Sequence, residues 1–187
     1  MYIMTSEATR EPTLDFLREN DYFGLCEDQL TIFEQRVIPA LDMQGKFIME
    51  TKSKLARSPN GNGGLYWALK RQGVLEDLER KDVRYLHVYC VDNVLVKVAD
   101  PVFMGYCISK NAESGNKVCE KILPEEAVGV VCRLAGKIQV VEYSEISAET
   151  SRLTTPDGKL TYKAGNICNH FFTRDFLKVS PVYSIPY

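Results

Sequence analysis

The segment Tyr85-Leu86-His87-Val88-Tyr89-Cys90-Val91 decides the fold class, because it is almost continuously apolar and rich in residues that favour strands. Such a run is typical of a strand buried on both faces, as in a parallel sheet covered by helices. A helix is expected before it, at residues 74–80. Another is expected after it, where Asp100-Pro101 supplies a favourable N-cap and first helical residue. Helix, buried strand and helix in this order indicate an α/β fold.

Upstream of that segment, the sequence predicts a mixture of short strands and helices. Strands are expected at residues 2–6, 30–33 and 47–49. Thr13 is expected to cap a short helix that ends at Asn20. Gly73 is expected to separate a helix at residues 65–72 from the helix at residues 74–80.

Downstream, the sequence is richer in strands. Three are expected at residues 117–122, 128–134 and 138–143, and Ala135-Gly136 should join the last two as a tight hairpin. A further strand or loop starts at residues 164–167, and Thr173 should cap a final helical piece. We therefore expect a mixed sheet with a β-rich insertion between Lys117 and Tyr143.

Composition excludes several classes of function. The chain has 187 residues, 45% of them hydrophobic, and a net charge of −2, so one ordinary domain without a nucleic-acid surface is expected. No apolar stretch approaches the roughly 20 residues that span a bilayer, and no secretory signal is visible. The six cysteines are scattered without a Cys-x-x-Cys pair, which favours reduced thiols and a cytoplasmic protein. The two histidines are far apart, and neither has a cluster of metal ligands around it.

Two glycine–asparagine pairs are candidates for ligand contact. Residues 59–64 read Pro-Asn-Gly-Asn-Gly-Gly directly before a predicted helix, so bare backbone and free N–H groups could meet an oxygen-rich ligand there. Gly165-Asn166 repeats the pairing of Gly61-Asn62. The alternative at both places is a simple turn, and the residues alone leave it open.

Two carboxylates at expected strand ends are the other candidates. Asp92 ends the buried strand, where a carboxylate can hold a divalent cation or a ribose hydroxyl; the alternative is a turn residue. Glu142 ends the second arm of the hairpin, where it could accept hydrogen bonds from sugar hydroxyls; the alternative is a solvent-facing acid. Together these residues suit a nucleotide or sugar site but define no reaction.

At these residues the chain resembles the UDP-N-acetylhexosamine pyrophosphorylases, the eukaryotic UTP-dependent uridylyltransferases. The clearest matches are His87-Val88-Tyr89-Cys90-Val91-Asp92-Asn93, Val140-Val141-Glu142-Tyr143-Ser144-Glu145-Ile146-Ser147 and Ala164-Gly165-Asn166-Ile167. Other matches, in the family's order, lie at residues 2–6, 33–35, 59–66, 128–132 and 169–172. The resemblance therefore covers nearly the whole chain, to about Lys178.

The resemblance implies a Rossmann-like mixed sheet of the nucleotide-sugar transferase type and a magnesium-dependent enzyme. UTP and N-acetylglucosamine 1-phosphate would give UDP-N-acetylglucosamine and pyrophosphate, with no covalent nucleophile on the protein. Positioning and charge neutralisation would then carry the rate. Partners beyond these small molecules, such as nucleic acid or a membrane, are not expected.

The resemblance also assigns roles to single residues. Gln35 and Gly61 match positions that contact uracil, and Asp92 matches the catalytic acid near the nucleotide phosphates and the metal. The remaining matches surround the sugar, and they are Asn62, Gly129, Glu142, Tyr143 and Asn166.

The chain departs from the family pattern at both ends. The Gly-rich loop that grips the phosphates, with its arginine and following lysine, matches nothing in residues 1–187, and residues 179–187 look unrelated. We therefore expect a central fragment, with a partial catalytic domain at residues 1–178 and a divergent, loose tail at residues 179–187. Such a fragment is expected to lack turnover by itself. A non-catalytic UDP-sugar-binding or interaction protein on the same scaffold is the alternative, and a preference for N-acetylgalactosamine or a simple hexose is a further one.

Overall fold

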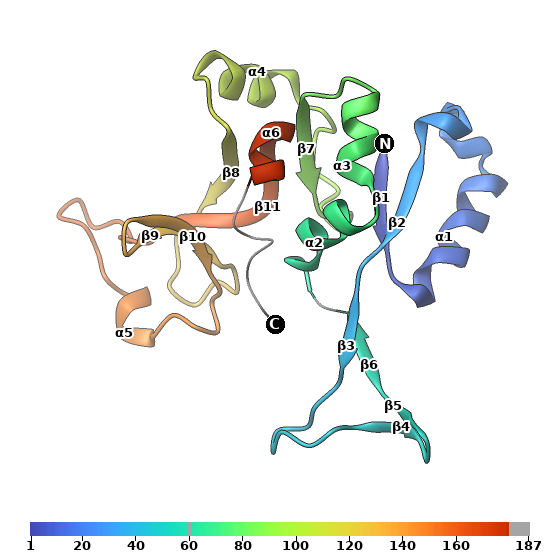
Figure 1. The fold of residues 1–187 in the computed structure, drawn as a ribbon. Coiled ribbons are helices and arrows are strands. Elements are labelled where there is room, and N and C mark those ends of the chain that lie inside the picture. The colour runs from blue at the N-terminus through green and yellow to red at the C-terminus, as the bar shows by residue number, and fades with distance from the viewer. Residues whose placement is uncertain (60, 180–187) are drawn as a thin grey trace. The chain divides into compact units, whose positions relative to one another are not determined.

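The computed structural model describes residues 1–59 and 61–179 of the chain, which falls into two compact units (Figure 1). Unit 1 comprises Met1–Lys81 together with the end of the chain from Lys178, and unit 2 comprises Asp82–Leu177. Each unit is described by itself. The boundary predicted at residue 178 stays a prediction, and so does the loose tail beyond it. Helix α6 (Arg174–Val179) runs one residue past that boundary, and residues 180–187 lie outside the described part.

Unit 1 is built on a short parallel sheet. Strand β1 (Tyr2–Thr5) pairs with β2 (Thr31–Glu34), from Tyr2 opposite Thr31 to Thr5 opposite Glu34. These two strands confirm the predictions for residues 2–6 and 30–33. The Tyr2 hydroxyl donates to Asp77 Oδ2 at 2.6 Å, which anchors β1 to helix α3 (Val74–Arg80).

Helix α1 (Glu7–Glu19) begins earlier than predicted. Ser6, not Thr13, is its N-cap, because the Ser6 N–H donates to Thr9 Oγ1 at 2.9 Å and the Ser6 carbonyl accepts the Arg10 N–H at 3.0 Å. Thr13 lies inside the helix and donates its hydroxyl to the carbonyl of Thr9 at 2.7 Å. A threonine that bonds back to the preceding turn gives the same sequence pattern as one that caps a helix start.

Helices α2 (Gly64–Arg71) and α3 (Val74–Arg80) confirm the predicted helix pair. Gly73 separates them with a φ of +71°, a conformation that favours glycine. Their apolar sides supply most of the unit's core, in which the most buried residues are Phe33, Ala68, Leu69, Val74, Leu75 and Leu78.

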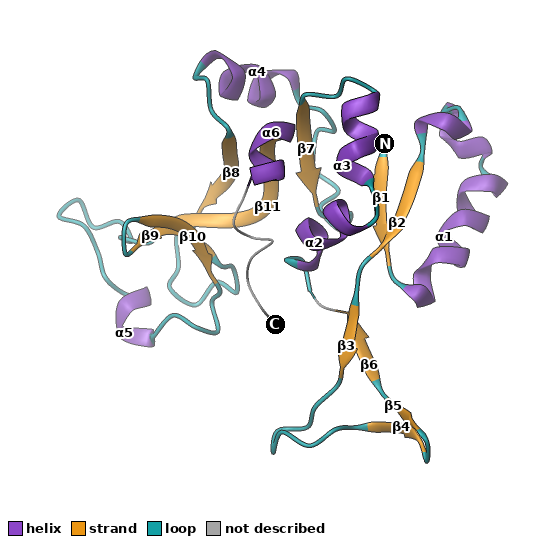
Figure 2. Ribbon diagram, viewed as in Figure 1, coloured by secondary structure: helices purple, strands orange, loops and turns teal. Residues whose placement is uncertain are grey.

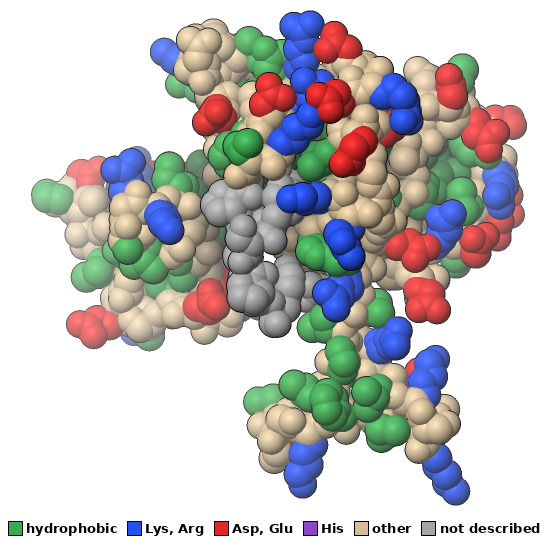
Figure 3. Space-filling model, in the orientation of Figure 1, with side chains coloured by type: hydrophobic (Ala, Val, Ile, Leu, Met, Phe, Trp, Pro, Cys, Tyr) green, Lys and Arg blue, Asp and Glu red, His purple; other side chains and the backbone are tan. Residues whose placement is uncertain are grey.

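A long excursion of unit 1, residues 37–59, consists of two small antiparallel ladders (Figure 2). Strand β3 (Val37–Pro39) pairs with β6 (Arg57–Pro59), and β4 (Met49–Thr51) pairs with β5 (Lys54–Leu55). The strand predicted at residues 47–49 is displaced, since it starts only at Met49. Hydrophobic side chains gather on this excursion (Figure 3), and those with more than a third of their surface exposed are Ile38, Leu41, Met43, Phe47, Ile48 and Met49.

Unit 2 contains a larger antiparallel sheet in the order β10-β9-β11-β7, with β8 also paired to β11 (Figure 2). Its strands are β7 (Tyr85–Tyr89), β8 (Ser114–Glu120), β9 (Val130–Leu134), β10 (Lys137–Val141) and β11 (Ala164–Thr173). The predicted β-rich insertion is therefore present, and the strand predicted from residue 164 is the longest of the sheet. The core of this unit lies along β11, where Phe171 is fully buried.

The prediction that residues 85–91 form a parallel strand buried on both faces is wrong. Strand β7 pairs antiparallel with β11, from Tyr85 opposite Thr173 to Tyr89 opposite Asn169, and its residues are half-buried or exposed. Within the strand, the His87 ring packs against the rings of Tyr89 and Phe103. Its Nε2 also lies 2.7 Å from Asn169 Oδ1 on the neighbouring strand.

Two local predictions for unit 2 are confirmed. Helix α4 (Pro101–Ser109) starts at Asp100, whose carboxylate accepts the Val102 N–H at 3.1 Å and pairs with Lys117 Nζ at 2.9 Å. The β9–β10 hairpin turns at Ala135-Gly136, with φ values of +48° and +80°. Positive φ at both central residues is the mark of the tight turn that suits the twist of a hairpin.

Candidate functional site

The structure brings Gly129, Glu142 and Asn166 together where β9, β10 and β11 meet. The Gly129 carbonyl accepts the Asn166 N–H at 2.8 Å. A methyl group built on Gly129 would lie 3.0 Å from Glu142 Oε2 and 3.2 Å from the Val141 carbonyl. The glycine is therefore needed for space, because a side chain there would push the carboxylate aside. Three residues that the resemblance assigned to the sugar thus form one cluster in unit 2.

Glu142 presents a carboxylate that is open to a ligand. The residue is exposed, and its carboxylate makes no hydrogen bond or ion pair with residues of the described part of the chain. Its backbone is held instead, since its carbonyl accepts the Glu145 N–H at 2.9 Å and the Ile146 N–H at 3.2 Å. A fixed backbone with free carboxylate oxygens suits a group that accepts hydrogen bonds from hydroxyls.

Asn166 is positioned by a bulge in β11. The pairing of β11 with β8 shifts register between Asn166 and Asn169, and Cys168 has a φ of +50°. Asn166 Oδ1 accepts the Cys168 N–H at 3.2 Å, while its Nδ2 lies 3.6 Å from Cys168 Sγ. Because sulfur is a weak acceptor, the amide keeps most of its capacity to donate to a ligand.

Cys90 and Cys168 connect this cluster to Asp92. They are the chain neighbours of the paired residues Tyr89 and Asn169, and their thiols are hydrogen-bonded to each other. Burial raises the pKa of the Cys90 thiol to about 11, with smaller contributions from Cys168 and the negative charge of Asp92. The raised pKa keeps the thiol in its protonated form at neutral pH, and a thiol is a weaker nucleophile than a thiolate. Sequence reasoning missed both cysteines as part of the site, and their positions on paired strands become evident only from the register.

Asp92 lies in the turn that follows β7 and is exposed. Among the described residues, no hydrogen bond or ion pair reaches its carboxylate, and no group of three or more histidine, cysteine, aspartate or glutamate side chains is arranged to hold a metal. Mg²⁺ is commonly held by one or two carboxylates together with water and substrate phosphates. The single free carboxylate of Asp92 fits that mode.

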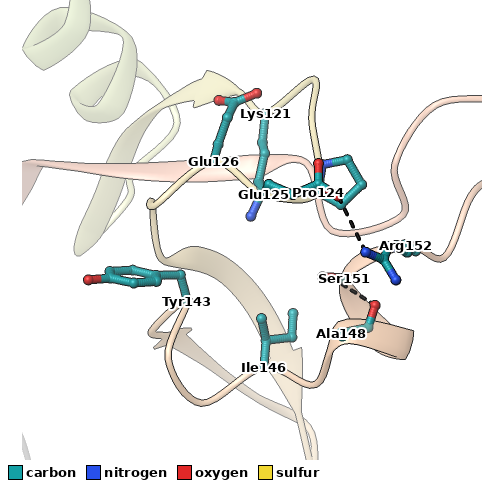
Figure 4. Close-up of a pocket in the computed structure, with 9 residues that line it drawn as sticks. All are labelled: Lys121, Pro124, Glu125, Glu126, Tyr143, Ile146, Ala148, Ser151 and Arg152. Atoms are coloured by element: carbon teal, nitrogen blue, oxygen red, sulfur yellow. Dashed lines mark hydrogen bonds and ion pairs between the residues drawn. The ribbon is translucent and has the colours of Figure 1, made fainter.

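Tyr143 follows Glu142 but lines a separate hollow of about 240 Å³ (Figure 4). Gly129, Glu142 and Asn166 are not among the residues that line it. The resemblance placed Tyr143 against the sugar, and that role stays a prediction.

The other predicted residues, Gln35, Gly61 and Asn62, belong to unit 1. The Gln35 N–H donates to the carbonyl of Thr5 at 2.8 Å, which fixes its backbone at the end of β2. Gly61 has a φ of +71°, and the Gly61 and Asn62 carbonyls accept the N–H groups that start α2, at 3.1 and 3.2 Å. No described residue bonds the Asn62 side chain. Their meeting with the cluster of unit 2 in one site stays a prediction.

The comparison with known families decides the identity of the fold. The sequence model of the UTP–glucose-1-phosphate uridylyltransferase family matches residues 1–179. The chain belongs to this family. Its relatives within the family include the human UDP-N-acetylhexosamine pyrophosphorylase-like protein 1, which is 58% identical over 177 residues. They also include UDP-N-acetylglucosamine diphosphorylase 2 of Arabidopsis thaliana, at 48% identity. The resemblance to the UDP-N-acetylhexosamine pyrophosphorylases is thus confirmed.

These alignments cover 95% of this chain and 35% of the human protein, and 94% of this chain and 36% of the plant protein. The chain thus spans about a third of the length of its curated relatives.

Solved structures confirm a mixed α/β fold of this family. A putative UDP-N-acetylglucosamine pyrophosphorylase of Entamoeba histolytica matches with a TM-score of 0.87 and 34% identity, over 99% of this chain and 46% of that one. The enzyme of Trypanosoma brucei, solved with an inhibitor, matches with a TM-score of 0.84 and 34% identity, over 95% and 36%. No helix in the described part of the chain is long and apolar enough to cross a membrane.

Proposed function

We propose that this chain carries the sugar-recognition part of a UDP-N-acetylglucosamine pyrophosphorylase. The observation that supports this most is the cluster of Gly129, Glu142 and Asn166 at the junction of β9, β10 and β11. It places a free carboxylate beside an amide and a bare backbone position. Such a combination can accept from sugar hydroxyls and donate to a carbonyl or ring oxygen.

The proposed reaction is a uridylyl transfer. A phosphate oxygen of N-acetylglucosamine 1-phosphate attacks the α-phosphorus of UTP, the new P–O bond forms, and the bond to the β-phosphate breaks to release pyrophosphate. In this proposal no residue of the protein becomes covalently modified. The role of the protein is to align the two phosphates and to bind charge as it shifts to the leaving group.

In this proposal the uracil contacts come from unit 1, and the sugar contacts come from residues of both units. Gln35 and Gly61 read the edge of uracil, with the Gln35 amide donating and accepting and the glycine allowing close approach of the base. Asn62 binds the sugar together with Asn166, while Glu142 orients its ring hydroxyls. Tyr143 packs against the sugar or its acetyl group.

Mg²⁺ is the proposed cofactor, and Asp92 is the residue that would hold it, as one ligand among phosphate oxygens and water. When bound, the metal would neutralise charge on the phosphates. Asp92 itself offers a carboxylate that no described residue engages. We also propose a cytoplasmic location, supported by six cysteines that are all free.

Calorimetric titration of the chain with UDP-N-acetylglucosamine tests the proposed sugar site. Glu142→Ala should weaken binding by about 1–3 kcal/mol, because hydroxyls of the bound sugar lose a charged acceptor. Glu113→Ala is the matched control, since Glu113 is an exposed carboxylate of the same unit outside the cluster. Equal affinities for wild type and Glu142→Ala would reject the sugar site.

A second measurement separates an enzyme from the alternative, a non-catalytic UDP-sugar binder on the same scaffold. Pyrophosphate release from UTP and N-acetylglucosamine 1-phosphate is followed with Mg²⁺ present, in this chain and in the same chain inside a protein of the relatives' length. Turnover in either supports the uridylyltransferase. Binding without turnover in both supports the binding protein.

A further inference from the structure

Two of the free cysteines of unit 2, Cys90 and Cys168, are in contact with each other. Cys90 directly follows β7, and Cys168 lies within β11. Their thiols share a hydrogen bond. Both residues are partly exposed, so a small molecule can reach them. Two free thiols in contact are the reduced form of a pair that can be oxidised to a disulfide.

The spacing of the two strands suits such a bridge. Neighbouring strands lie about 4.7–4.9 Å apart, and the Cα atoms of a disulfide are usually about 4.4–6.8 Å apart. The two cysteines are the chain neighbours of Tyr89 and Asn169, which are paired across β7 and β11. Residues beside a cross-strand pair lie within the reach of a disulfide, and the contact between the thiols shows that these side chains are turned toward each other.

Cys168 is the residue with room to adjust. The register between β11 and β8 shifts between Asn166 and Asn169, so no residue of the described strand β8 is opposite Cys168. Cys168 has a φ of +50°, and its N–H donates to the side-chain oxygen Oδ1 of Asn166 at 3.2 Å. A bulged residue of this kind can shift without breaking the pairing with β8.

Each cysteine is also joined to a residue of the proposed site. Cys168 contacts Asn166 twice, through its N–H and through its Sγ, which lies 3.6 Å from Asn166 Nδ2. Cys90 starts the turn that carries Asp92, and its carbonyl accepts the Asn93 N–H at 3.3 Å. A bond between the two sulfur atoms would draw the Cys168 side chain toward Cys90 and away from the amide of Asn166.

We propose that Cys90 and Cys168 form a reversible disulfide, which makes the pair a redox-sensitive modification site beside the sugar cluster. Closure of the bridge disturbs the orientation of the Asn166 amide and thereby weakens binding of UDP-N-acetylglucosamine. This second step rests on the proposed function, whereas formation of the disulfide does not. Where disulfides occur in compartments that keep thiols reduced, they are usually transient and redox-sensing or catalytic.

The oxidant is a small-molecule disulfide such as oxidised glutathione. One cysteine thiolate attacks a sulfur of the oxidant, a mixed disulfide forms, and one glutathione leaves as a thiolate. The second cysteine loses its proton to solvent and attacks the protein sulfur of the mixed disulfide, and the second glutathione leaves. Two protein thiols are thus oxidised to one disulfide. One oxidised glutathione is reduced to two thiols, which take up the two protons.

The raised pKa of the Cys90 thiol slows this exchange, because only the thiolate attacks, but it does not alter the balance of the reaction. The two thiols are held in contact, and such proximity favours the second, intramolecular step over reaction with another glutathione.

The test is treatment of the full chain with oxidised glutathione until the reaction is complete. The remaining thiols are then alkylated, and the peptides are mapped by mass spectrometry without reduction. A linked peptide that contains Cys90 and Cys168 should be the main product of both residues, and dithiothreitol should return it to two free thiols. The exposed residues Cys26 and Cys119 should instead stay free or carry glutathione.

Cys168→Ala should abolish the linked peptide and leave Cys90 free or bound to glutathione. Cys132→Ala is the matched control, since Cys132 is also a partly exposed free cysteine of unit 2, and it should give the linked peptide in the yield of wild type. If Cys168→Ala fails to fold by circular dichroism, Cys90→Ala takes its place. The proposal is overturned if wild type gives no linked peptide, or if Cys90 is joined to Cys119 or Cys132 as often as to Cys168.

Calorimetry with UDP-N-acetylglucosamine tests the effect on the sugar cluster. Oxidised wild type should bind at least about threefold more weakly than reduced wild type, because an amide that is out of position loses its hydrogen bond to the ligand. The same treatment of Cys168→Ala should leave its affinity unchanged, which controls for glutathione bound elsewhere. Equal affinities of oxidised and reduced wild type would contradict control of Asn166 by the disulfide. Absence of binding by the reduced protein would instead reject the proposed sugar site, while the peptide map still decides whether the disulfide forms.

Discussion

The two glycine–asparagine pairs, Gly61-Asn62 and Gly165-Asn166, look alike in sequence but require glycine for different reasons. Gly61, in unit 1, has a φ of +71°, and a Cβ there would meet nothing within 4 Å. Gly165, in unit 2, lies within β11, where a Cβ would lie 3.1 Å from both the carbonyl and the Sγ of Cys119. The first glycine is required by backbone conformation and the second by close packing. The same dipeptide therefore marks an open loop in one unit and a crowded sheet in the other.

The largest expected effect tests this difference in stability. Gly165→Ala should lower the free energy of unfolding by about 2 kcal/mol, because the added methyl group must displace backbone that is paired on both sides. Gly165 is opposite Cys119 on β8 and opposite Val130 on β9, so neither neighbour can move freely. Urea unfolding followed by circular dichroism measures the loss.

Gly61→Ala should cost less, about 1 kcal/mol, since only its left-handed conformation opposes a side chain. Gly105→Ala is the control for replacing a glycine by alanine where neither crowding nor a left-handed backbone opposes it. Gly105 lies in α4 with open space around its Cβ position, so alanine should stabilise the protein slightly. Equal losses at positions 61 and 165 would show that the two pairs do not differ as described.

The next effect concerns the two asparagines. Asn166→Ala should lower both stability, by about 1 kcal/mol, and affinity for UDP-N-acetylglucosamine, because its Oδ1 holds the Cys168 N–H at 3.2 Å within the bulge. Asn62→Ala should lower affinity alone, since no described residue bonds its side chain. Calorimetry and urea unfolding on the same samples separate the two quantities.

Asn166→Asp sharpens that comparison. Aspartate keeps an oxygen that can accept the Cys168 N–H but loses the NH₂ donor, so stability should be retained while affinity falls. A loss of stability as large as that of Asn166→Ala would mean that the bond to Cys168 does not position the residue.

Local features of both units could be predicted from the sequence because they depend on neighbouring residues. Asp100-Pro101 starts α4 through the carboxylate of one residue and the fixed φ of the next. Ala135-Gly136 turns the β9–β10 hairpin for similarly local reasons. The role of Gly129 could not be predicted in this way, because glycine has no side chain whose chemistry would indicate one. Only the family resemblance indicated it, and only the structure shows the Glu142 carboxylate next to it.

Long-range features could not be predicted. An apolar run such as residues 85–91 does not say which strand lies beside it, or in which direction, so the antiparallel partner β11 was missed. The contact between Cys90 and Cys168 joins segments that are far apart in the chain, next to the paired residues Tyr89 and Asn169. Through these two cysteines, Asp92 is linked to Asn166 and so to the cluster of Gly129, Glu142 and Asn166.

The smallest expected effect compares the acid response of the units. Both contain a carboxylate whose pKa is lowered mainly by one side chain: Asp77 by the Tyr2 hydroxyl in unit 1, and Asp100 by Lys117 in unit 2. A carboxylate whose folded pKa is lowered stabilises the fold above its unfolded pKa, near 3.8 for Asp100, and that contribution is lost as pH falls through the folded value.

Asp100→Asn keeps an N-cap for α4, since asparagine caps as well as aspartate, but removes the pair with Lys117. The variant should therefore be less stable than wild type at pH 7, and the difference should vanish below the folded pKa of Asp100. Hydrogen exchange measured at both pH values should place the change on amides of α4 and β8, with α3 and β1 unaffected. A difference that persists in acid, or that spreads equally to amides of unit 1, would show that the charge of Asp100 does not act locally within unit 2.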